Sequence, residues 1–242
     1  MSPIRIKVLI PNFGMDEATL EARRAMLSKF VSSEVEISVE GLEKGPSSIE
    51  YFTDEYLAGC SLIKQSIRAE KQGFQAIVIY CFSDVAITAI RENVAVPVIG
   101  PGEVSLAVAD MISNRFTVIT TSKENISRTW RRLRKNTIAK EKMTSVRQLD
   151  IHVVDLREDP DNTGKSLYQV CHEAKINEDI DTVILGCLGL AGYGDRVKKE
   201  LGLKLIDPAF LAISFAEMAV RNDLVPVQLS FSTYPKSFDY EL

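Results

Sequence analysis

The sequence predicts an α/β protein of two similar lobes, each a mostly parallel four-stranded sheet flanked by helices, related by a pseudo-twofold axis with a cleft between them. Two observations lead to this fold class. Apolar strand-like runs alternate with amphipathic helical stretches along the whole chain, which is typical of a parallel sheet covered by helices. The same series of elements also occurs twice, at an offset of about 106 to 112 positions.

The first half of the chain contains four strand–helix units. Runs rich in valine and isoleucine favour strands, and they predict strands at 4–11, 35–39, 76–80 and 96–99. Apolar residues at helical spacing predict the helices at 17–31, 54–72, 84–92 and 103–112.

The second half repeats this order. Strands are predicted at 116–120, within 146–156, at 182–186 and at 204–206, and helices at 123–136, 164–177, 196–201 and 209–220.

The third strands of the two halves match best, because IVIYCFSD (77–84) corresponds to VILGCLGL (183–190) and places a cysteine at the same strand end. We infer an internal duplication, with chance alternation of strand–helix units as the alternative. The first lobe is assigned to 1–100 plus 209–242 and the second to 101–208. The polar segment after Asn222 is interpreted as an extension over another surface or a neighbouring subunit.

Composition excludes several classes of function. The 242 residues carry a formal net charge of −4, which argues against nucleic acid or an anionic membrane as the main partner. No apolar run approaches the roughly 18 residues of a membrane span, and a cytoplasmic location is expected. The cysteines lack CxxC spacing and are predicted to be free thiols, and the two histidines have no ligand-like spacing, so no metal site is predicted.

Ligands of open parallel sheets bind beyond the carboxyl ends of the strands, so the active site is predicted in the cleft between the lobes. The residues at these ends are two cysteines, small hydroxyl residues, an asparagine and their neighbours. They are Pro11, Asn12, Ser48, Cys81, Phe82, Ser83, Thr120, Thr121, Cys187, Leu188 and Gly189. No cationic group is expected among them, which indicates proton chemistry on a polar, uncharged small molecule.

Cys81 and Cys187 each follow a buried strand and precede a turn or helix. A helix N-terminus can lower a thiol pKa from ~8.5 into the range ~3.5–7.5, so the thiolate can act as a base. A racemase without a cofactor needs two such groups, one on each face of an acidic carbon. Core packing is the better interpretation for either cysteine alone, and their equivalent positions favour catalysis. Cys60 and Cys171 are assigned to the core, and Asp84 is predicted to be a helix N-cap.

These motifs resemble those of the aspartate/glutamate racemase superfamily, and within it the hydantoin and allantoin racemases. The resemblance covers residues 4–220 and is carried by Pro11-Asn12, GPSSIE (45–50), CFSD (81–84), VITT (118–121), LGCLGLA (185–191) and the strand ending in Ile206-Asp207. It implies a cofactor-independent racemase with Cys81 and Cys187 as catalytic residues. It also implies substrate contacts near Asn12, Ser48, Ser83, Thr121 and Gly189, and a homo-oligomer.

Amino-acid racemases of the superfamily usually have Asn-Thr after the first cysteine and Thr with His or Glu after the second. Here Phe82-Ser83 and Leu188-Gly189 stand in those places, which favours a neutral cyclic ureide. The chain also departs from the hydantoin-type pattern at Phe13, Val85 and Pro208, where threonine, proline and glycine are common.

We therefore expect reversible racemisation at C5 of a 5-substituted hydantoin or of allantoin, with closure of the two lobes around the substrate. Two alternatives lie in the same superfamily, an amino-acid racemase and a maleate-isomerase-like cysteine enzyme. A third is a two-lobed binding protein without catalytic activity. A nucleotide-binding protein is disfavoured because no glycine-rich loop follows the first strand.

Overall fold

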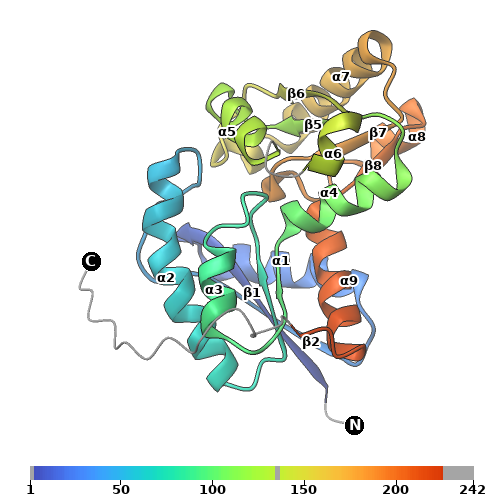
Figure 1. The fold of residues 1–242 in the computed structure, drawn as a ribbon. Helices are drawn as coiled ribbons and strands as arrows, with labels where there is room; N and C mark the ends of the chain where they lie inside the picture. The colour runs from blue at the N-terminus through green and yellow to red at the C-terminus, as the bar shows by residue number, and fades with distance from the viewer. Residues whose placement is uncertain (1–2, 134–136, 226–242) are drawn as a thin grey trace.

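The computed structural model describes residues 3–133 and 137–225, which form two α/β lobes (Figure 1). The first lobe contains a parallel sheet with strand order β2-β1-β3-β4, and the second a parallel sheet with order β6-β5-β7-β8. The two orders are the same when the strands are counted within each lobe. The predicted fold class is therefore confirmed, and the repeat in the sequence corresponds to a repeat in topology.

In the first lobe the strands are β1 (Ile4–Phe13), β2 (Val35–Leu42), β3 (Ala76–Ile79) and β4 (Val98–Ile99). The helices that connect them are α1 (Glu17–Leu27) with the short 3-10 turn η1 (Ser28–Phe30), α2 (Phe52–Lys71) and α3 (Ile87–Asn93). Helix α4 (Pro101–Ile112) leads into the second lobe.

In the second lobe the strands are β5 (Phe116–Thr120), β6 (Met143–Gln148), β7 (Thr182–Leu185) and β8 (Lys204–Ile206). The helices and turns are α5 (Lys123–Leu133), α6 (Thr137–Lys142), η2 (Asp155–Arg157), α7 (Pro160–Glu178), η3 (Leu188–Leu190) and α8 (Asp195–Leu201). The last helix, α9 (Pro208–Arg221), returns to the first lobe and packs on its sheet.

Two predicted boundaries differ from those in the structure because of the local backbone conformation. The helix expected at 84–92 begins only at Ile87, because Asp84 and Ala86 have φ values of 49° and 55°, in the left-handed region that a right-handed helix excludes. The strand expected within 146–156 is β6, which ends at Gln148, and the chain then forms η2. These shifts leave the order of elements unchanged.

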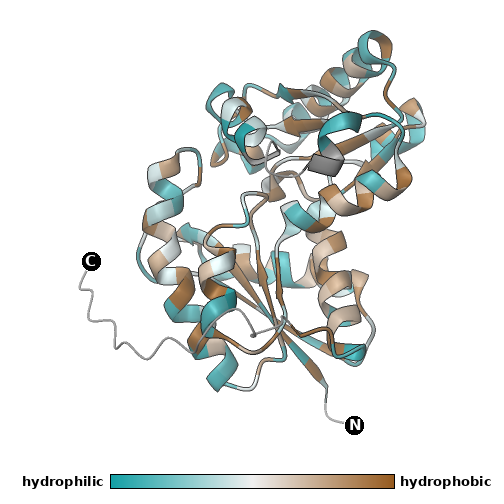
Figure 2. Ribbon diagram, viewed as in Figure 1, coloured by the Kyte–Doolittle hydropathy of each residue, from teal (hydrophilic) through white to brown (hydrophobic). Residues whose placement is uncertain are grey.

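One apolar core is shared by the two lobes. Helices α4 and α9 pack against each other, and a single cluster of buried side chains includes Val8, Ala109 and Ile213 together with Val118 and Ile184 of the second sheet. Figure 2 shows hydrophobic residues along the strands of the first sheet and on much of α9. Burial of this continuous apolar surface stabilises the position of one lobe relative to the other.

Each lobe also has an apolar cluster of its own, on the face of its sheet away from the shared core. The division into 1–100 plus 209–242 and 101–208 stays a prediction. Helix α9 does contact β1, β3 and β4 of the first lobe, whereas the predicted extension lies largely at 226–242, outside the described residues. Within 3–133 and 137–225, no helix has the length and apolar character needed to cross a bilayer.

Candidate active site

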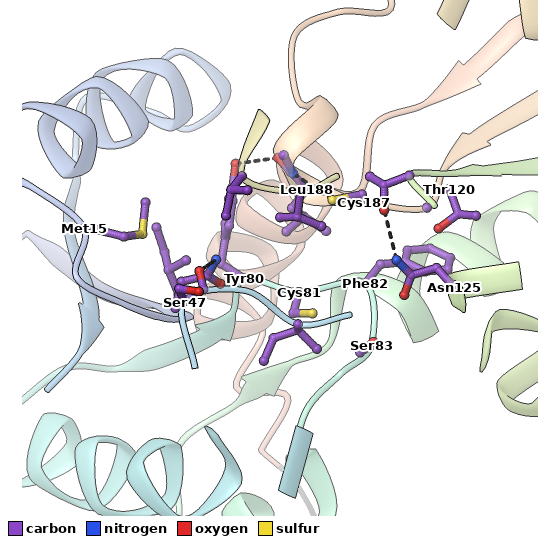
Figure 3. Close-up of a pocket in the computed structure, with 18 of the residues that line it drawn as sticks. Met15, Ser47, Tyr80, Cys81, Phe82, Ser83, Thr120, Asn125, Cys187 and Leu188 are labelled. Atoms are coloured by element: carbon purple, nitrogen blue, oxygen red, sulfur yellow. Dashed lines mark hydrogen bonds between the residues drawn. The ribbon is translucent and has the colours of Figure 1, made fainter. Parts of the chain in front are cut away.

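A cavity of about 380 Å³ is lined by residues from both lobes at the carboxyl ends of the strands. This size lies in the usual range for small-molecule sites. Cys81 follows β3 and Cys187 follows β7, and both line the cavity (Figure 3). The structure thus brings one thiol from each lobe to a common space.

The end of β1 contributes Ile10 and Asn12 to the cavity. Pro11 is buried and absent from the lining, because successive side chains of a strand point to opposite faces. The structure therefore does not bring Pro11 to the cavity with the other predicted site residues. Ser48 is also absent from the lining, and Ser47 takes the place predicted for it. The carbonyl oxygen of Ser47 accepts a hydrogen bond of 2.8 Å from Asn12 Nδ2, which joins the two loops.

The loop after Cys81 is fixed by a tight turn and by a carboxylate. The Asp84 N–H donates to the Cys81 carbonyl oxygen at 3.0 Å. The Asp84 side chain accepts from the N–H groups of Gly102 and Glu103, both at 2.8 Å. Asp84 therefore caps the N-terminus of α4, and not the helix that directly follows it as the sequence predicted. Phe82 and Ser83, which flank this turn, both line the cavity.

In the second lobe the corresponding carboxylate lies at the start of the helix and reaches the loop that follows the cysteine. Asp207 is the N-cap of α9 and accepts from the Ala209 N–H at 3.1 Å. Its other oxygen accepts from the Gly192 N–H at 2.9 Å, in the loop that follows Cys187. In each lobe one carboxylate therefore ties the cysteine loop to the N-terminus of the helix after the last strand.

Cys187 is the N-cap of η3, and its Sγ accepts a hydrogen bond of 3.4 Å from the Gly189 N–H. Although part of its surface faces the cavity, burial raises the pKa of this thiol to about 12. The proximity of Cys81 raises the pKa further, whereas the Gly189 N–H lowers it. The expectation of a lowered pKa is wrong for Cys187, because desolvation outweighs the contribution of a one-turn helix.

This raised pKa predicts slow alkylation of Cys187. The thiolate is the reactive species, so the rate should rise about tenfold per pH unit from pH 7 to pH 10 without a plateau. Exposed Cys60 is the internal reference in the same sample. Iodoacetamide labelling followed by peptide mass spectrometry measures both rates. A plateau of the Cys187 rate below pH 9 would show that its pKa is not raised.

The other two cysteines lie outside the cavity lining. Cys171 is buried on α7, as predicted, and burial raises its pKa to about 12. Cys60 is exposed on α2, so its assignment to the core is wrong. Among the described residues, no three His, Cys, Asp or Glu side chains gather in a group that could hold a metal ion.

Strand β5 ends in hydroxyl side chains that face the cavity. Thr120 and Thr121 are both buried and line it, as do Leu188 and Gly189 from η3. Thr121 Oγ1 accepts a hydrogen bond of 2.9 Å from Asn125 Nδ2, and Asn125 also lines the cavity. These polar groups come from the second lobe, whereas Asn12 and Ser83 come from the first.

Tyr80, the residue before Cys81, was not among the predicted site residues. Its ring lines the cavity and its hydroxyl donates to the Leu188 carbonyl oxygen at 3.4 Å, which connects the two lobes. Burial raises the pKa of Tyr80, so its hydroxyl stays protonated and able to donate. Its position at a strand end was visible in the sequence, but an aromatic residue after an apolar strand is ordinarily assigned to the core.

Arg23, Arg128 and Arg157 also line the cavity. The prediction that no cationic group converges on the site is therefore wrong. The arginines come from α1, α5 and η2, whereas the prediction considered only strand ends. With three arginines in its lining, the cavity no longer indicates an uncharged ligand.

Comparison with known proteins identifies the family. The model for Asp/Glu/Hydantoin racemase matches residues 6–216. The chain belongs to this family. It is 30% identical to the hydantoin racemase of Pseudomonas sp. (strain NS671), over 98% of this chain and 94% of that protein. It is 29% identical to the hydantoin racemase of Rhizobium meliloti, over 96% of this chain and 95% of that protein.

A solved structure of allantoin racemase from Klebsiella pneumoniae matches with a TM-score of 0.89 and 25% identity, covering 98% of this chain and 97% of that one. The family resemblance seen in the sequence is thus confirmed. These relatives are racemases, so this Asp/Glu/Hydantoin racemase family member is an isomerase.

Proposed function

We propose that the protein racemises a five-membered cyclic ureide, a 5-substituted hydantoin or allantoin, by proton transfer between Cys81 and Cys187. The observation that carries this proposal is the placement of the two thiols, one from each lobe, on a single cavity of about 380 Å³. The names of the relatives support the substrate ring. The carbon at C5 is acidified by the adjacent ring carbonyl, so the reaction requires no electron-sink cofactor.

In one direction the Cys81 thiolate removes the proton from C5, and the electron pair of the C–H bond becomes an enolate on the ring carbonyl. The Cys187 thiol then donates its proton to the opposite face of C5. The product leaves with inverted configuration, Cys81 is a thiol and Cys187 is a thiolate. The reverse reaction runs from this second state, so no atom is gained or lost.

The electrostatics of the pair oppose ionisation of both thiols at once. Burial raises the pKa of Cys187 and so keeps its proton in place, and a negative charge on Cys81 raises this pKa further. Two neighbouring groups that repel in their charged forms lose their protons in two separate steps. One thiol and one thiolate are the state that each direction of the reaction needs.

Neutral donors and acceptors around the thiols suit a ureide ring. Asn12 and Ser83 come from the first lobe, and Thr120, Thr121 and Asn125 from the second. The hydroxyl and amide groups can both donate and accept, which matches the alternating N–H and C=O groups of the ring. Ring recognition therefore requires both lobes to contact the same substrate.

Exchange of the C5 proton in deuterated water tests the reaction. Wild-type protein should incorporate deuterium into 5-substituted hydantoins or allantoin and invert them, as read by NMR and circular dichroism. The Cys81→Ala/Cys187→Ala double variant corrects for spontaneous exchange. Aspartate and glutamate should remain unlabelled. Exchange of these amino acids alone would instead favour the amino-acid racemase alternative and overturn the ureide assignment.

A further inference from the structure

The three arginines of the cavity differ in their partners. Arg128 is buried and forms an ion pair with Glu55 on α2, and it also donates to Asn125 Oδ1 at 2.5 Å. Its guanidinium lies 3.4 Å from Ser83 Oγ, in the loop after Cys81. The charge of Arg128 is therefore neutralised by the protein itself.

Arg157 lies beside the loop that follows Cys187. Its Nη2 donates to the Ala191 carbonyl oxygen at 2.7 Å, and its guanidinium lies 4.7 Å from the centre of the Tyr193 ring. These contacts hold the side chain in place but contribute no negative charge. Arg157 is exposed as a whole residue, but it lines the cavity and its guanidinium end is partly surrounded by protein.

Arg23 approaches the same loop from α1. Residues three or four positions apart share a helix face, so Arg23 lies on one face with Thr19 and Met26. Thr19 also lines the cavity. Met26 Sδ lies close to Gly192, 3.7 Å from the position that a Cβ would take there. Arg23 and Arg157 thus reach the cavity beside the segment 191–192, one from each lobe.

No protein carboxylate forms an ion pair with Arg23 or Arg157 within 3–133 and 137–225. The cavity lining contains no Asp or Glu. The oxygens of nearby Asp207 already accept hydrogen bonds from backbone N–H groups. Burial lowers the pKa of Arg157, and Arg23 lowers it further, as expected for two cations that repel. The Asp207 carboxylate raises this pKa, by less than Arg23 lowers it.

We infer that Arg23 and Arg157 bind a carboxylate on the C5 substituent of the ring, so that the substrate is an acidic cyclic ureide. This inference rests on the proposed function. An anion between the two guanidinium groups would relieve their repulsion and accept charge-assisted hydrogen bonds from both. The ring would then lie toward the thiols and its acidic arm toward the loop at 191–192.

Two isosteric substrate pairs test the inference: 5-carboxymethylhydantoin against 5-carbamoylmethylhydantoin, and 5-(2-carboxyethyl)hydantoin against its amide. Wild-type protein should show a higher kcat/KM for the acid in at least one pair. Arg23→Gln and Arg157→Gln should each lower the acid-to-amide ratio of kcat/KM by about tenfold or more, because each removes a charged hydrogen bond. The fall in kcat/KM for the acid should come mainly from a higher KM.

Arg24→Gln is the matched control, because Arg24 lies on the same helix, is exposed and pairs with Glu21 outside the cavity. It should leave the ratio unchanged. A parallel fall for acid and amide in the Arg23 and Arg157 variants would assign these arginines to the chemical step and overturn the inference. Equal wild-type kcat/KM for acid and amide would also overturn it while leaving the reaction in place. Turnover of none of the four hydantoins, nor of allantoin, would overturn the proposed reaction itself.

Discussion

Replacing either Cys81 or Cys187 by alanine is expected to lower the racemisation rate by roughly 10²–10⁴-fold, the range that a positioned acid or base contributes. Each variant retains one thiol on one face of the substrate. That thiol can remove a proton and return a deuteron to the same face. Each variant should therefore exchange the C5 hydrogen of one enantiomer with retention, and the two variants should prefer opposite enantiomers.

Chiral chromatography of each pure enantiomer, followed by NMR of the recovered substrate, measures inversion and exchange separately. Cys60→Ala is the matched control, because Cys60 is exposed on α2 and absent from the cavity lining. Both single variants should keep the circular dichroism spectrum of the wild type. Racemisation at the wild-type rate in either cysteine variant would refute the two-thiol mechanism.

Gly102→Ala is expected to lower the free energy of unfolding by about 3 kcal/mol and the activity by roughly 10²-fold. A Cβ at Gly102 would lie 2.2 Å from the Phe82 carbonyl oxygen and 2.7 Å from Asp84 Oδ2. The N-terminus of α4 must then move away from the loop that carries Cys81. This movement disrupts the cap on α4 and displaces the sulfur from its place in the cavity.

Gly164→Ala provides the comparison for this change. Gly164 lies inside α7, and a Cβ there would have only an ordinary contact of 3.8 Å with the Tyr193 ring. Alanine is the better helix former by about 1 kcal/mol, so this variant should be as stable as the wild type or more so. Urea denaturation gives both free energies. A Gly102→Ala protein with wild-type stability and activity would show that the contact between α4 and the Cys81 loop is loose.

The sequence predicted features that depend on short stretches of chain. The apolar runs of β3 and β5 are buried along their whole length, and the rule that ligands bind at the carboxyl ends of strands was enough to bring Cys81 and Cys187 to one cavity. It was harder to predict which side chains at the end of a strand face the cavity. The prediction included Pro11 with Asn12, although neighbouring strand residues point to opposite sides.

Features set by tertiary contacts could not be read from the sequence. Arg23, Arg128 and Arg157 lie on helices and a turn, and only the packing of these elements brings them to the cavity. The partner of Asp84 is the N-terminus of α4, beyond an intervening helix and strand. The raised pKa of Cys187 depends on how much protein surrounds its sulfur, which no local pattern records.

The apolar cluster that joins both sheets through α4 and α9 also restricts how a ligand enters. A wide swing of one half against the other would expose that surface to water, and its hydrophobic cost makes such openings rare events. Access through the rim near α1 and η2 disturbs much less buried surface, because Phe13 and Val154 there are already about half exposed. Small, fast displacements at this rim, rather than rotation of whole halves, would then set the rate at which ligands exchange with solvent.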